Sequence, residues 1–281
     1  MLYGLTMFIT ETSLQPAELA RAAEDRGFDS IWAPEHTHIP SARKTPWPGG
    51  PVLPDYYSQT YDPFLALTAM AAVTTRLKLA TGICLIVQRD PLTTAKQIAT
   101  LDRISGGRFI FGIGGGWNRE EVEDHGTPFA KRFPILRERI LAMKALWTQD
   151  EAEFHGQYVN FDKSWAWPKP VQKPHPPIIM GGDGPTTFDR IVEFCDGWLP
   201  ITRGGGVPAD LAGKILDLRH RLQAAGRDPD ALTVSLFGAP PNQDVVAAAT
   251  RSGIDRVIFG VPSAPKDAAL KALDEYAKLV K

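Results

Sequence analysis

The amino-acid sequence predicts an α/β protein, a closed (β/α)₈ TIM-type barrel with insertions. Short apolar runs alternate with amphipathic stretches from end to end, which is the pattern of repeated βα units and a parallel sheet. Eight such units can be counted, and eight is the number that closes this kind of barrel. The length of 281 residues, 43% of them hydrophobic, suits one domain over residues 1–281, because such barrels typically take about 250 residues.

The expected strands are runs rich in branched or aromatic residues, each followed by a helix candidate. In chain order they are Leu2–Ile9, Phe28–Ala33, Leu77–Val87, Arg108–Ile113, Pro177–Met180, Gly197–Pro200, Thr233–Phe237 and Arg256–Val261. Residues that directly follow these strands gather at one end of the barrel, where such barrels place their active sites.

The expected helices carry local start signals. Asp62-Pro63 and Asp90-Pro91 each place a capping acid before a proline at the first helical position, where the missing N–H costs nothing. Between residues 136 and 147, apolar side chains recur every three or four positions, which indicates one buried helix face.

Charge and cysteine content argue against several classes of protein. The 31 Lys+Arg against 32 Asp+Glu give a formal net charge of -1, without the basic excess that binds nucleic acid or a membrane surface. Cys84 and Cys195 fit no disulfide or metal-ligand spacing, so we expect two buried thiols. The N-terminus lacks a signal-peptide pattern, and no apolar run approaches the roughly 20 residues of a membrane span. A soluble cytoplasmic protein is expected.

Two connections are too long for a minimal barrel. Residues 34–61 hold six prolines together with Trp47, Tyr56 and Tyr57, so the segment is stiff and apolar, and a lid over a pocket is expected. Residues 148–176 contain an extended segment followed by two tryptophans and four prolines. Both insertions are expected near the barrel rim, because loops after strands build the active face of such barrels.

A glycine-rich segment, Phe111–Arg119, follows the fourth strand. Gly114, Gly115 and Gly116 allow a flat ligand to lie directly on the backbone. The segment is not a dinucleotide fingerprint, since Trp117 occupies the last glycine position, and no P-loop lysine follows. A tight βα turn without a ligand explains the same glycines.

A second glycine-rich segment, Met180–Thr187, closes the fifth strand and opens a helix. Gly181, Gly182 and the hydroxyl of Thr186 would surround exposed N–H groups at the helix N-terminus, an arrangement that suits a phosphate. A capped turn is the alternative. Many barrels bind phosphate after strands seven and eight, so the position after the fifth strand departs from that pattern.

The segment Trp32–His38 lies where the second strand emerges into the pocket. His36 can exchange a proton near neutral pH, as hydride transfer to or from a C–O or C=C carbon requires. Glu35 is placed to orient or tune it. The alternative is a rim histidine that hydrogen-bonds to the first insertion.

The pair His36 and His38 also suggests a metal-dependent hydrolase. Such a site needs further ligands at other strand ends. His155 lies in an insertion, His220 lies in mid-helix and His175 precedes its strand, so no metal ion is expected. Ligand binding without turnover is a third possibility, which an activity screen would separate from catalysis.

In this order and at these separations, the segments resemble the luciferase-like family of flavin- and F420-dependent oxidoreductases over nearly the whole chain. The matching segments are Tyr3-Gly4-Leu5, Gly27 to Trp32, Glu35 to Pro40, Gly107-Arg108-Phe109, Gly112 to Glu121, Gly181-Gly182 and Asp196-Gly197-Trp198. The segments from Glu35 and from Gly112 look closest to a subgroup regarded as F420-dependent.

The resemblance implies an isoalloxazine-type ring in the barrel mouth, a phosphate near Gly181-Gly182 and often a homodimer. It also implies a bulge in the third strand, frequently with a non-prolyl cis peptide, for which Gly82-Ile83 is the positional match. In relatives that oxidise sugar phosphates or alcohols with F420, a histidine after strand two handles the substrate proton, and His36 matches it. Their catalytic glutamate corresponds here to Trp117, so that mechanism does not carry over whole.

We therefore predict an oxidoreductase that transfers a hydride between coenzyme F420 and a small organic substrate, with His36 and Glu35 at the chemistry. The residues expected to bind the cofactor are Gly82, Ile83, Gly114, Gly115, Gly116, Trp117, Gly181, Gly182 and Thr186. The basic residues expected near the anionic tail of F420 are Arg43, Lys44, Arg89 and Arg203. The alternative on the same barrel is an FMN-dependent monooxygenase that uses reduced flavin and oxygen, and a metal hydrolase is least favoured.

Overall fold

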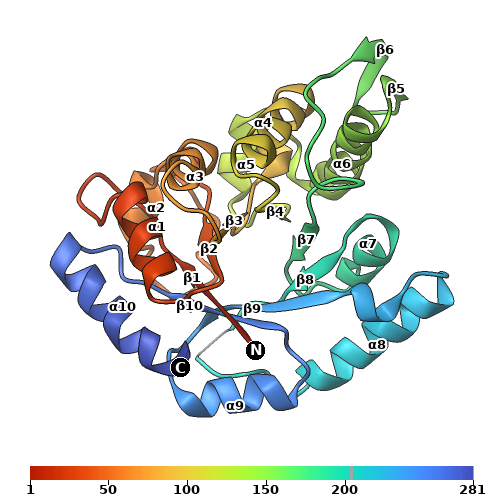
Figure 1. Cartoon of the computed structure of the whole chain (residues 1–281). Coiled ribbons are helices and arrows are strands. Elements are labelled where there is room, and N and C mark those ends of the chain that lie inside the picture. The colour runs from red at the N-terminus through yellow and green to blue at the C-terminus, as the bar shows by residue number, and fades with distance from the viewer. Residues whose placement is uncertain (203–204, 281) are drawn as a thin grey trace.

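A computed structural model describes residues 1–202 and 205–280. It contains a closed barrel of parallel strands in the spatial order β1-β10-β9-β8-β7-β4-β3-β2 (Figure 1). The barrel strands are β1 (Leu2–Thr6), β2 (Ser30–Ala33), β3 (Lys78–Thr81), β4 (Phe109–Ile113), β7 (Ile178–Gly181), β8 (Gly197–Leu199), β9 (Thr233–Ala239) and β10 (Arg256–Gly260). The predicted fold class is confirmed, and each expected strand contributes one strand of the barrel.

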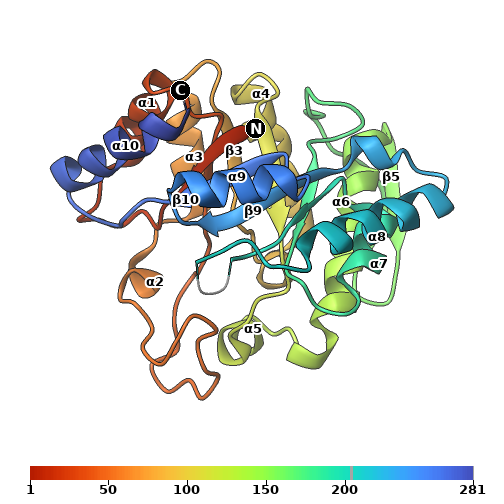
Figure 2. The same ribbon diagram turned by 90° about the horizontal axis from the view of Figure 1, so that it is seen from below.

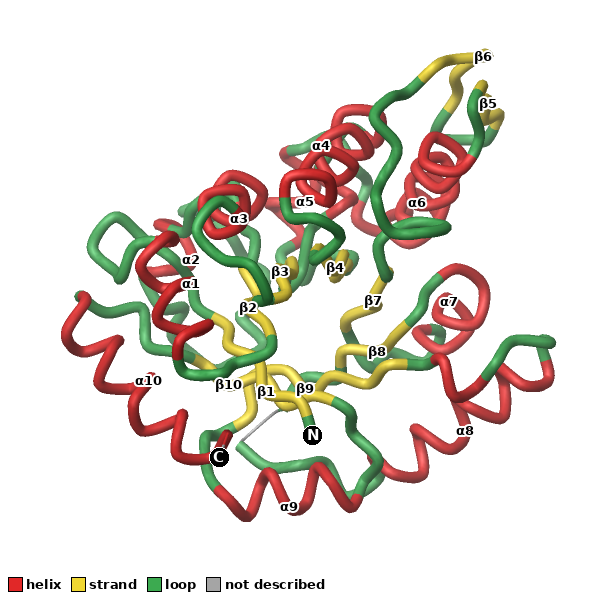
Figure 3. Tube along the Cα trace, in the orientation of Figure 1, coloured by secondary structure: helices red, strands yellow, loops and turns green. Residues whose placement is uncertain are grey.

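Most of the helices surround the barrel on its outside, whereas α2 and α5 lie beyond one end of it (Figure 2 and Figure 3). They are α1 (Pro16–Asp25), α2 (Tyr56–Gln59), α3 (Pro63–Ala71), α4 (Pro91–Ile104), α5 (Arg119–Asp124), α6 (Arg132–Thr148), α7 (Thr187–Phe194), α8 (Leu211–Ala224), α9 (Gln243–Arg251) and α10 (Lys266–Val280). Three short 3₁₀ turns are η1 (Ile86–Gln88), η2 (Phe129–Lys131) and η3 (Pro229–Ala231). No helix in the described part of the chain has the length and apolar character needed to cross a membrane.

The predicted start signals of α3 and α4 are confirmed. The Asp62 carboxylate accepts hydrogen bonds from the backbone N–H groups of Phe64 (2.9 Å) and Leu65 (3.0 Å). The Asp90 carboxylate accepts one from the N–H of Thr93 (2.7 Å). Each helix therefore begins with part of its unpaired N–H set satisfied by the residue that the sequence places there.

The inside of the barrel is filled by a small apolar cluster to which most strands contribute one side chain. Its members are Trp32, Ala80, Ile110, Ile179, Leu199 and Ile258. Gly4 of β1 makes room for the tryptophan, since an added Cβ would lie 3.1 Å from Nε1 of Trp32. Ile83 and Phe237 pack against this cluster from the residues near the C-terminal ends of β3 and β9. They form the floor of the end that carries the candidate site.

The cysteines behave as expected. Cys84 and Cys195 are free and buried. Burial raises the pKa of both thiols, well above the ordinary value for Cys84, so neither is an activated nucleophile.

The third strand is shorter than the apolar run Leu77–Val87 predicts. β3 ends at Thr81, the peptide Gly82–Ile83 is cis, and Ile86–Gln88 forms the turn η1. The cis peptide lies where the resemblance placed it. The run is apolar throughout because the turn is as buried as the strand, with Leu85 at 3% exposure and Ile86 fully buried. An apolar run by itself does not separate a strand from a buried turn.

The first insertion, residues 34–61, extends from the C-terminal end of the barrel together with α5. Figure 2 shows α2 and α5 on the side opposite the start of the chain. The insertion returns to the barrel at Tyr61, whose N–H donates to the carbonyl of Ile9 (2.8 Å). The insertion therefore lies at the C-terminal end of the barrel, and its movement as a lid stays a prediction.

The second insertion, residues 148–176, lies at the other end of the barrel, which corrects the expectation that both insertions serve the active face. It forms the antiparallel hairpin β5 (Glu151–His155) and β6 (Asn160–Trp165). Its continuation holds the N-terminal end of β4, since Nε2 of Gln172 donates to the carbonyl of Phe109 (2.7 Å). The reason is topological: this insertion follows a helix rather than a strand, and helices of such a barrel end where the next strand begins.

Candidate functional site

An aromatic cluster covers the C-terminal end of the barrel beside β1, β2 and β4. The ring of Tyr57, in α2, lies 4.5 Å from Phe8, 5.0 Å from His36 and 5.6 Å from Trp47 between ring centroids. The Trp117 ring meets His36 edge-on at 5.9 Å. The rings of Tyr57 and Trp117 therefore cover His36, whose side chain is only 7% exposed.

His36 is held by a carboxylate that the sequence analysis did not select. Its Nδ1 lies 2.8 Å from Oε2 of Glu121, which is 1% exposed. His36 follows β2, whereas Glu121 lies in the first turn of α5, directly after the glycines that end β4. The available signal was local: an acid in the first turn of a short helix that follows a glycine-rich strand end.

Glu35, expected to orient His36, points elsewhere. Its carboxylate accepts from the N–H of Leu85 (2.6 Å) and forms an ion pair with Arg89. Arg89 also pairs with Asp62 (2.6 Å). Glu35 and His36 are adjacent in sequence, yet their side chains contact different partners. His36 therefore pairs with Glu121 and not with Glu35.

The same network accounts for Arg89, expected near a cofactor tail. Burial lowers the pKa of its guanidinium, but the Glu35 carboxylate outweighs this and the pKa is raised overall. Arg89 is thus an internal cation that joins the end of β2 to α3. Of the other basic residues expected there, Arg43 lies over the Trp117 ring at 5.8 Å, Lys44 is exposed, and Arg203 lies outside the described residues.

Helix α5 fastens the first insertion over the site. The Glu120 carboxylate accepts hydrogen bonds from the hydroxyl of Thr45 (2.6 Å) and from the N–H of Lys44 (2.8 Å). These hydrogen bonds, the one from Thr45 first, lower the pKa of Glu120 to about 2. From one turn of α5, Glu120 therefore contacts Lys44 and Thr45, and Glu121 contacts His36.

His36 and His38 do not face a common site. Nε2 of His38 lies 3.1 Å from Oδ2 of Asp124, and the hydroxyl of Thr37 lies 2.7 Å from Nε2 of His125. Within residues 1–202 and 205–280, no group of three or more His, Cys, Asp or Glu side chains is arranged to hold a metal ion.

Three glycines predicted to bind a cofactor, Gly82, Gly114 and Gly181, lie around the side chain of Ile83, which was also predicted to bind it. A Cβ added to Gly114 would lie 1.9 Å from Cδ1 of Ile83, and one added to Gly181 would lie 3.1 Å from its Cγ2. The cis peptide Gly82–Ile83, the end of β4 and the end of β7 therefore come together around one side chain. The structure also explains two further glycines by packing: Gly115 lies against the Phe133 ring, and Gly116 has a φ of +73°.

The loop after β7 is more open. Gly182 has a φ of +104°, and no heavy atom outside its chain neighbours lies within 4 Å of an added Cβ. Its carbonyl accepts from Nε1 of Trp198 (2.7 Å). Thr186 precedes α7 without capping it, and its hydroxyl oxygen instead accepts from Nη2 of Arg190 (2.7 Å). The N–H of Thr187, the first residue of α7, donates to the carbonyl of Gly184 (3.0 Å), and no side-chain cap from Thr186 satisfies the N–H groups that follow.

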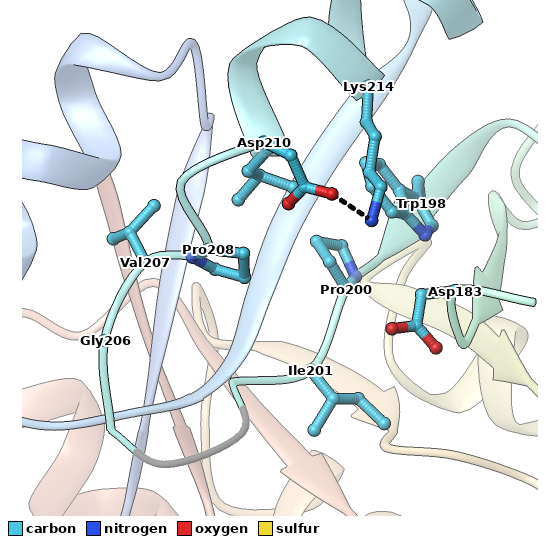
Figure 4. Close-up of a pocket in the computed structure, with 10 residues that line it drawn as sticks. Asp183, Trp198, Pro200, Ile201, Gly206, Val207, Pro208, Asp210 and Lys214 are labelled. Atoms are coloured by element: carbon cyan, nitrogen blue, oxygen red, sulfur yellow. Dashed lines mark ion pairs between the residues drawn. The ribbon is translucent and has the colours of Figure 1, made fainter.

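A cavity of about 340 Å³ lies beside this loop, at the end of β8 (Figure 4). Trp198 and Pro200 line one side of it, and the ion pair between Asp210 and Lys214 (2.7 Å) lies at its edge.

Several buried polar atoms near the glycine segment lack a partner in the described part of the chain. They include both side-chain atoms of Asn118, which is 1% exposed, and Oε1 of Glu121. Both residues follow the glycines of β4. Because buried polar atoms are nearly always hydrogen-bonded, such atoms at a strand end indicate a polar ligand or bound water.

The chain matches known proteins over nearly its whole length. The model of the luciferase-like monooxygenase family matches residues 14–279. The chain is 43% identical over 281 residues to an uncharacterised protein of Mycobacterium tuberculosis, covering 99% of this chain and 98% of that protein.

Two functionally described proteins are more distant. An FMNH₂-dependent dimethylsulfone monooxygenase of Pseudomonas putida is 34% identical over 161 residues, which cover 56% of this chain and 43% of that protein. The solved structure of an F420-dependent secondary alcohol dehydrogenase, in complex with an F420-acetone adduct, superimposes with a TM-score of 0.75 at 20% identity and covers 100% of both chains. Similar proteins thus include users of F420 and of reduced FMN, and the chain belongs to the luciferase-like monooxygenase family.

Proposed function

We propose that the protein is an oxidoreductase that transfers a hydride between coenzyme F420 and a small alcohol or carbonyl compound. The observation that carries the proposal is the buried contact between Nδ1 of His36 and Glu121, at the barrel end where this fold places its chemistry. Hydride transfer at a C–O carbon requires a partner that gives or takes the oxygen's proton, and a carboxylate-held imidazole suits that task.

The residues present fit a tricyclic cofactor with a phosphate. The amide of Asn118 is an orphaned buried polar group that suits the polar edge of such a ring. Gly182 leaves open space at the N-terminal end of α7, which suits a phosphate. When bound, F420 supplies or accepts the hydride.

His36 exchanges the proton with the substrate, and Glu121 holds the His36 ring in place. The contact with Glu121 occupies Nδ1, and the described residues form no hydrogen bond with Nε2 of the same ring. Nε2 is therefore the atom that exchanges a proton with the substrate oxygen, while the carboxylate fixes the tautomer and the ring orientation. The aromatic cover of Phe8, Tyr57 and Trp117 excludes water from this exchange once a substrate is enclosed.

The cover also implies a gating step. With His36 only 7% exposed, a substrate reaches it after Tyr57 and the first insertion move aside. The hydrogen bonds from Lys44 and Thr45 to Glu120 hold the insertion to α5, and we propose that they open in this movement.

An FMN-dependent monooxygenase is the second candidate, and the similarity to the dimethylsulfone monooxygenase favours it. Titrating the purified protein with F420 and with FMN, at low and high salt, separates the two. We expect tighter binding of F420, and loss of its oxidised absorbance without oxygen when a panel of secondary alcohols is added. Tighter FMN binding at low salt, with oxygen uptake in the presence of reduced FMN, would replace the proposal with the monooxygenase.

A further inference from the structure

Three arginines stack on two neighbouring phenylalanine rings beside the candidate site. The guanidinium of Arg132, at the start of α6, lies 3.8 Å from the ring centroid of Phe129 and 4.5 Å from that of Phe133. Arg190 of α7 lies 3.7 Å from the Phe133 centroid, and Arg119 of α5 lies 4.7 Å from that of Phe129. We call these five side chains the arginine platform.

The positive charge of the platform is incompletely balanced. Arg119 pairs with Glu123 (3.2 Å), but Arg132 and Arg190 form no ion pair with any residue in the described part of the chain. Nε of Arg132 is buried without a partner. Burial first, and then a neighbouring arginine, lowers the pKa of both groups: Arg119 acts on Arg132, and Arg132 acts on Arg190, where Asp189 opposes the shift. Three guanidinium groups gathered on two rings, with one ion pair among them, favour an anion beside them.

The arginine platform lies between the two glycine-rich loops of the candidate site. The Phe133 ring packs against Gly115 of the loop after β4, where an added Cβ would approach it to 2.8 Å. Arg190 donates to Thr186 of the loop after β7. Figure 2 places α5 and the beginning of α6 at the same end of the barrel as the first insertion. The arginine platform thus lies at the end of the barrel that holds His36.

Helices α6 and α7 provide an internal comparison. Arg137 and Glu193 join the same two helices through an ordinary ion pair, with Nε 2.7 Å from Oε1. The interface is therefore fastened elsewhere by a balanced pair. The charges of Arg132 and Arg190 are therefore not needed to hold the two helices together.

We propose that Arg132 and Arg190 bind the phosphate group of the cofactor, with the first turn of α7 as a further donor. This inference rests on the proposed function and names the residues that select a phosphorylated cofactor over its phosphate-free form. Guanidinium groups match phosphate oxygens with paired N–H donors, and the two arginines approach from different helices. The basic residues at the first insertion are then not the primary determinants of affinity.

The test compares cofactors with and without phosphate. Affinities of wild type, Arg132→Met and Arg190→Met are measured for F420 and for the deazaflavin with a free ribityl chain, which lacks both phosphate and tail. FMN and riboflavin form the second pair and differ only in the phosphate. Each substitution should weaken the phosphorylated ligands roughly 10- to 100-fold, since a hydrogen bond to a charged group contributes about 1.5–3 kcal/mol and 1.4 kcal/mol is tenfold. The phosphate-free ligands should bind all variants equally. Arg137→Met is the matched control and should change none of these affinities.

Other outcomes overturn the inference. Unchanged affinity for phosphorylated ligands in folded Arg132→Met and Arg190→Met would show that the platform is structural, as would equal losses for ligands with and without phosphate. If neither ring system binds, the proposed function fails, and inorganic phosphate then tests the platform alone. Phosphate that raises the melting temperature of wild type and Arg137→Met, but of neither platform variant, supports it. An equal response in all four proteins refutes it.

Discussion

The contact between His36 and Glu121 makes a sharp prediction about turnover. Glu121→Gln keeps the size of the side chain and removes its charge, while leaving an oxygen or amide beside Nδ1 of His36. Because Glu121 acts through His36 rather than on the substrate, we expect the variant to bind cofactor with nearly wild-type affinity, to keep its KM and to lose kcat.

The geometry sets the size of this loss. A charge-assisted hydrogen bond of 2.8 Å between two side chains that are 7% and 1% exposed contributes about 1.5–3 kcal/mol. If that contribution is needed when the proton moves, kcat falls roughly 10- to 100-fold, at 1.36 kcal/mol for each factor of ten. His36→Asn removes the proton-transfer group itself and should lower turnover by roughly 10²–10⁴.

A double-mutant cycle decides between positioning and a general structural effect. In the His36→Asn background, Glu121→Gln should have almost no further effect on kcat, because the residue through which it acts is gone. The assay is single-turnover reduction of F420, with melting temperatures measured in parallel. Additive losses, or a loss of cofactor affinity with kcat retained, would refute the assigned roles of both residues.

Three further predictions concern the cover, the barrel and the loop after β7. The pKa of Glu120 lies near 2 against an ordinary 4.5, so its contribution is complete above pH 4.5 and is lost as the pH falls through 2. Glu120→Gln should therefore increase proteolysis within residues 40–60 at pH 7, and wild type should approach the variant between pH 4.5 and 2; equal cleavage at pH 7 would count against the fastening. Arg108, 9% exposed, donates to the carbonyls of Ala71, Thr74, Leu77 and Ser105, so Arg108→Met should lower the free energy of unfolding by roughly 3–5 kcal/mol in urea titrations. A loss under about 1 kcal/mol, as expected for the exposed Arg137, would contradict this. Gly182→Asp and Gly182→Asn strain the backbone alike at a φ of +104°, but only the first adds charge at the start of α7. Gly182→Asp should therefore weaken the binding of phosphorylated cofactors more than Gly182→Asn in equilibrium titrations. Equal affinities of the two variants would show that the phosphate does not bind at this loop.

The strands, the helix starts and the insertions follow from local sequence. Eight apolar runs separated by amphipathic stretches define a closed parallel barrel, and Asp62 and Asp90 mark helix starts through contacts within three residues. His36 was placed at the barrel mouth because loops after strands meet there. The run Leu77–Val87 was misassigned in part, because a buried turn and a buried strand have the same composition.

The partners of the site residues were decided only by the tertiary structure. Glu35 and His36 are adjacent in sequence, yet one pairs with Arg89 and the other with Glu121, 85 residues away. The two arginines without acidic partners lie on separate helices. Local periodicity reports which face of an element is buried, whereas the pairing of charges depends on distances that are fixed only when the barrel closes.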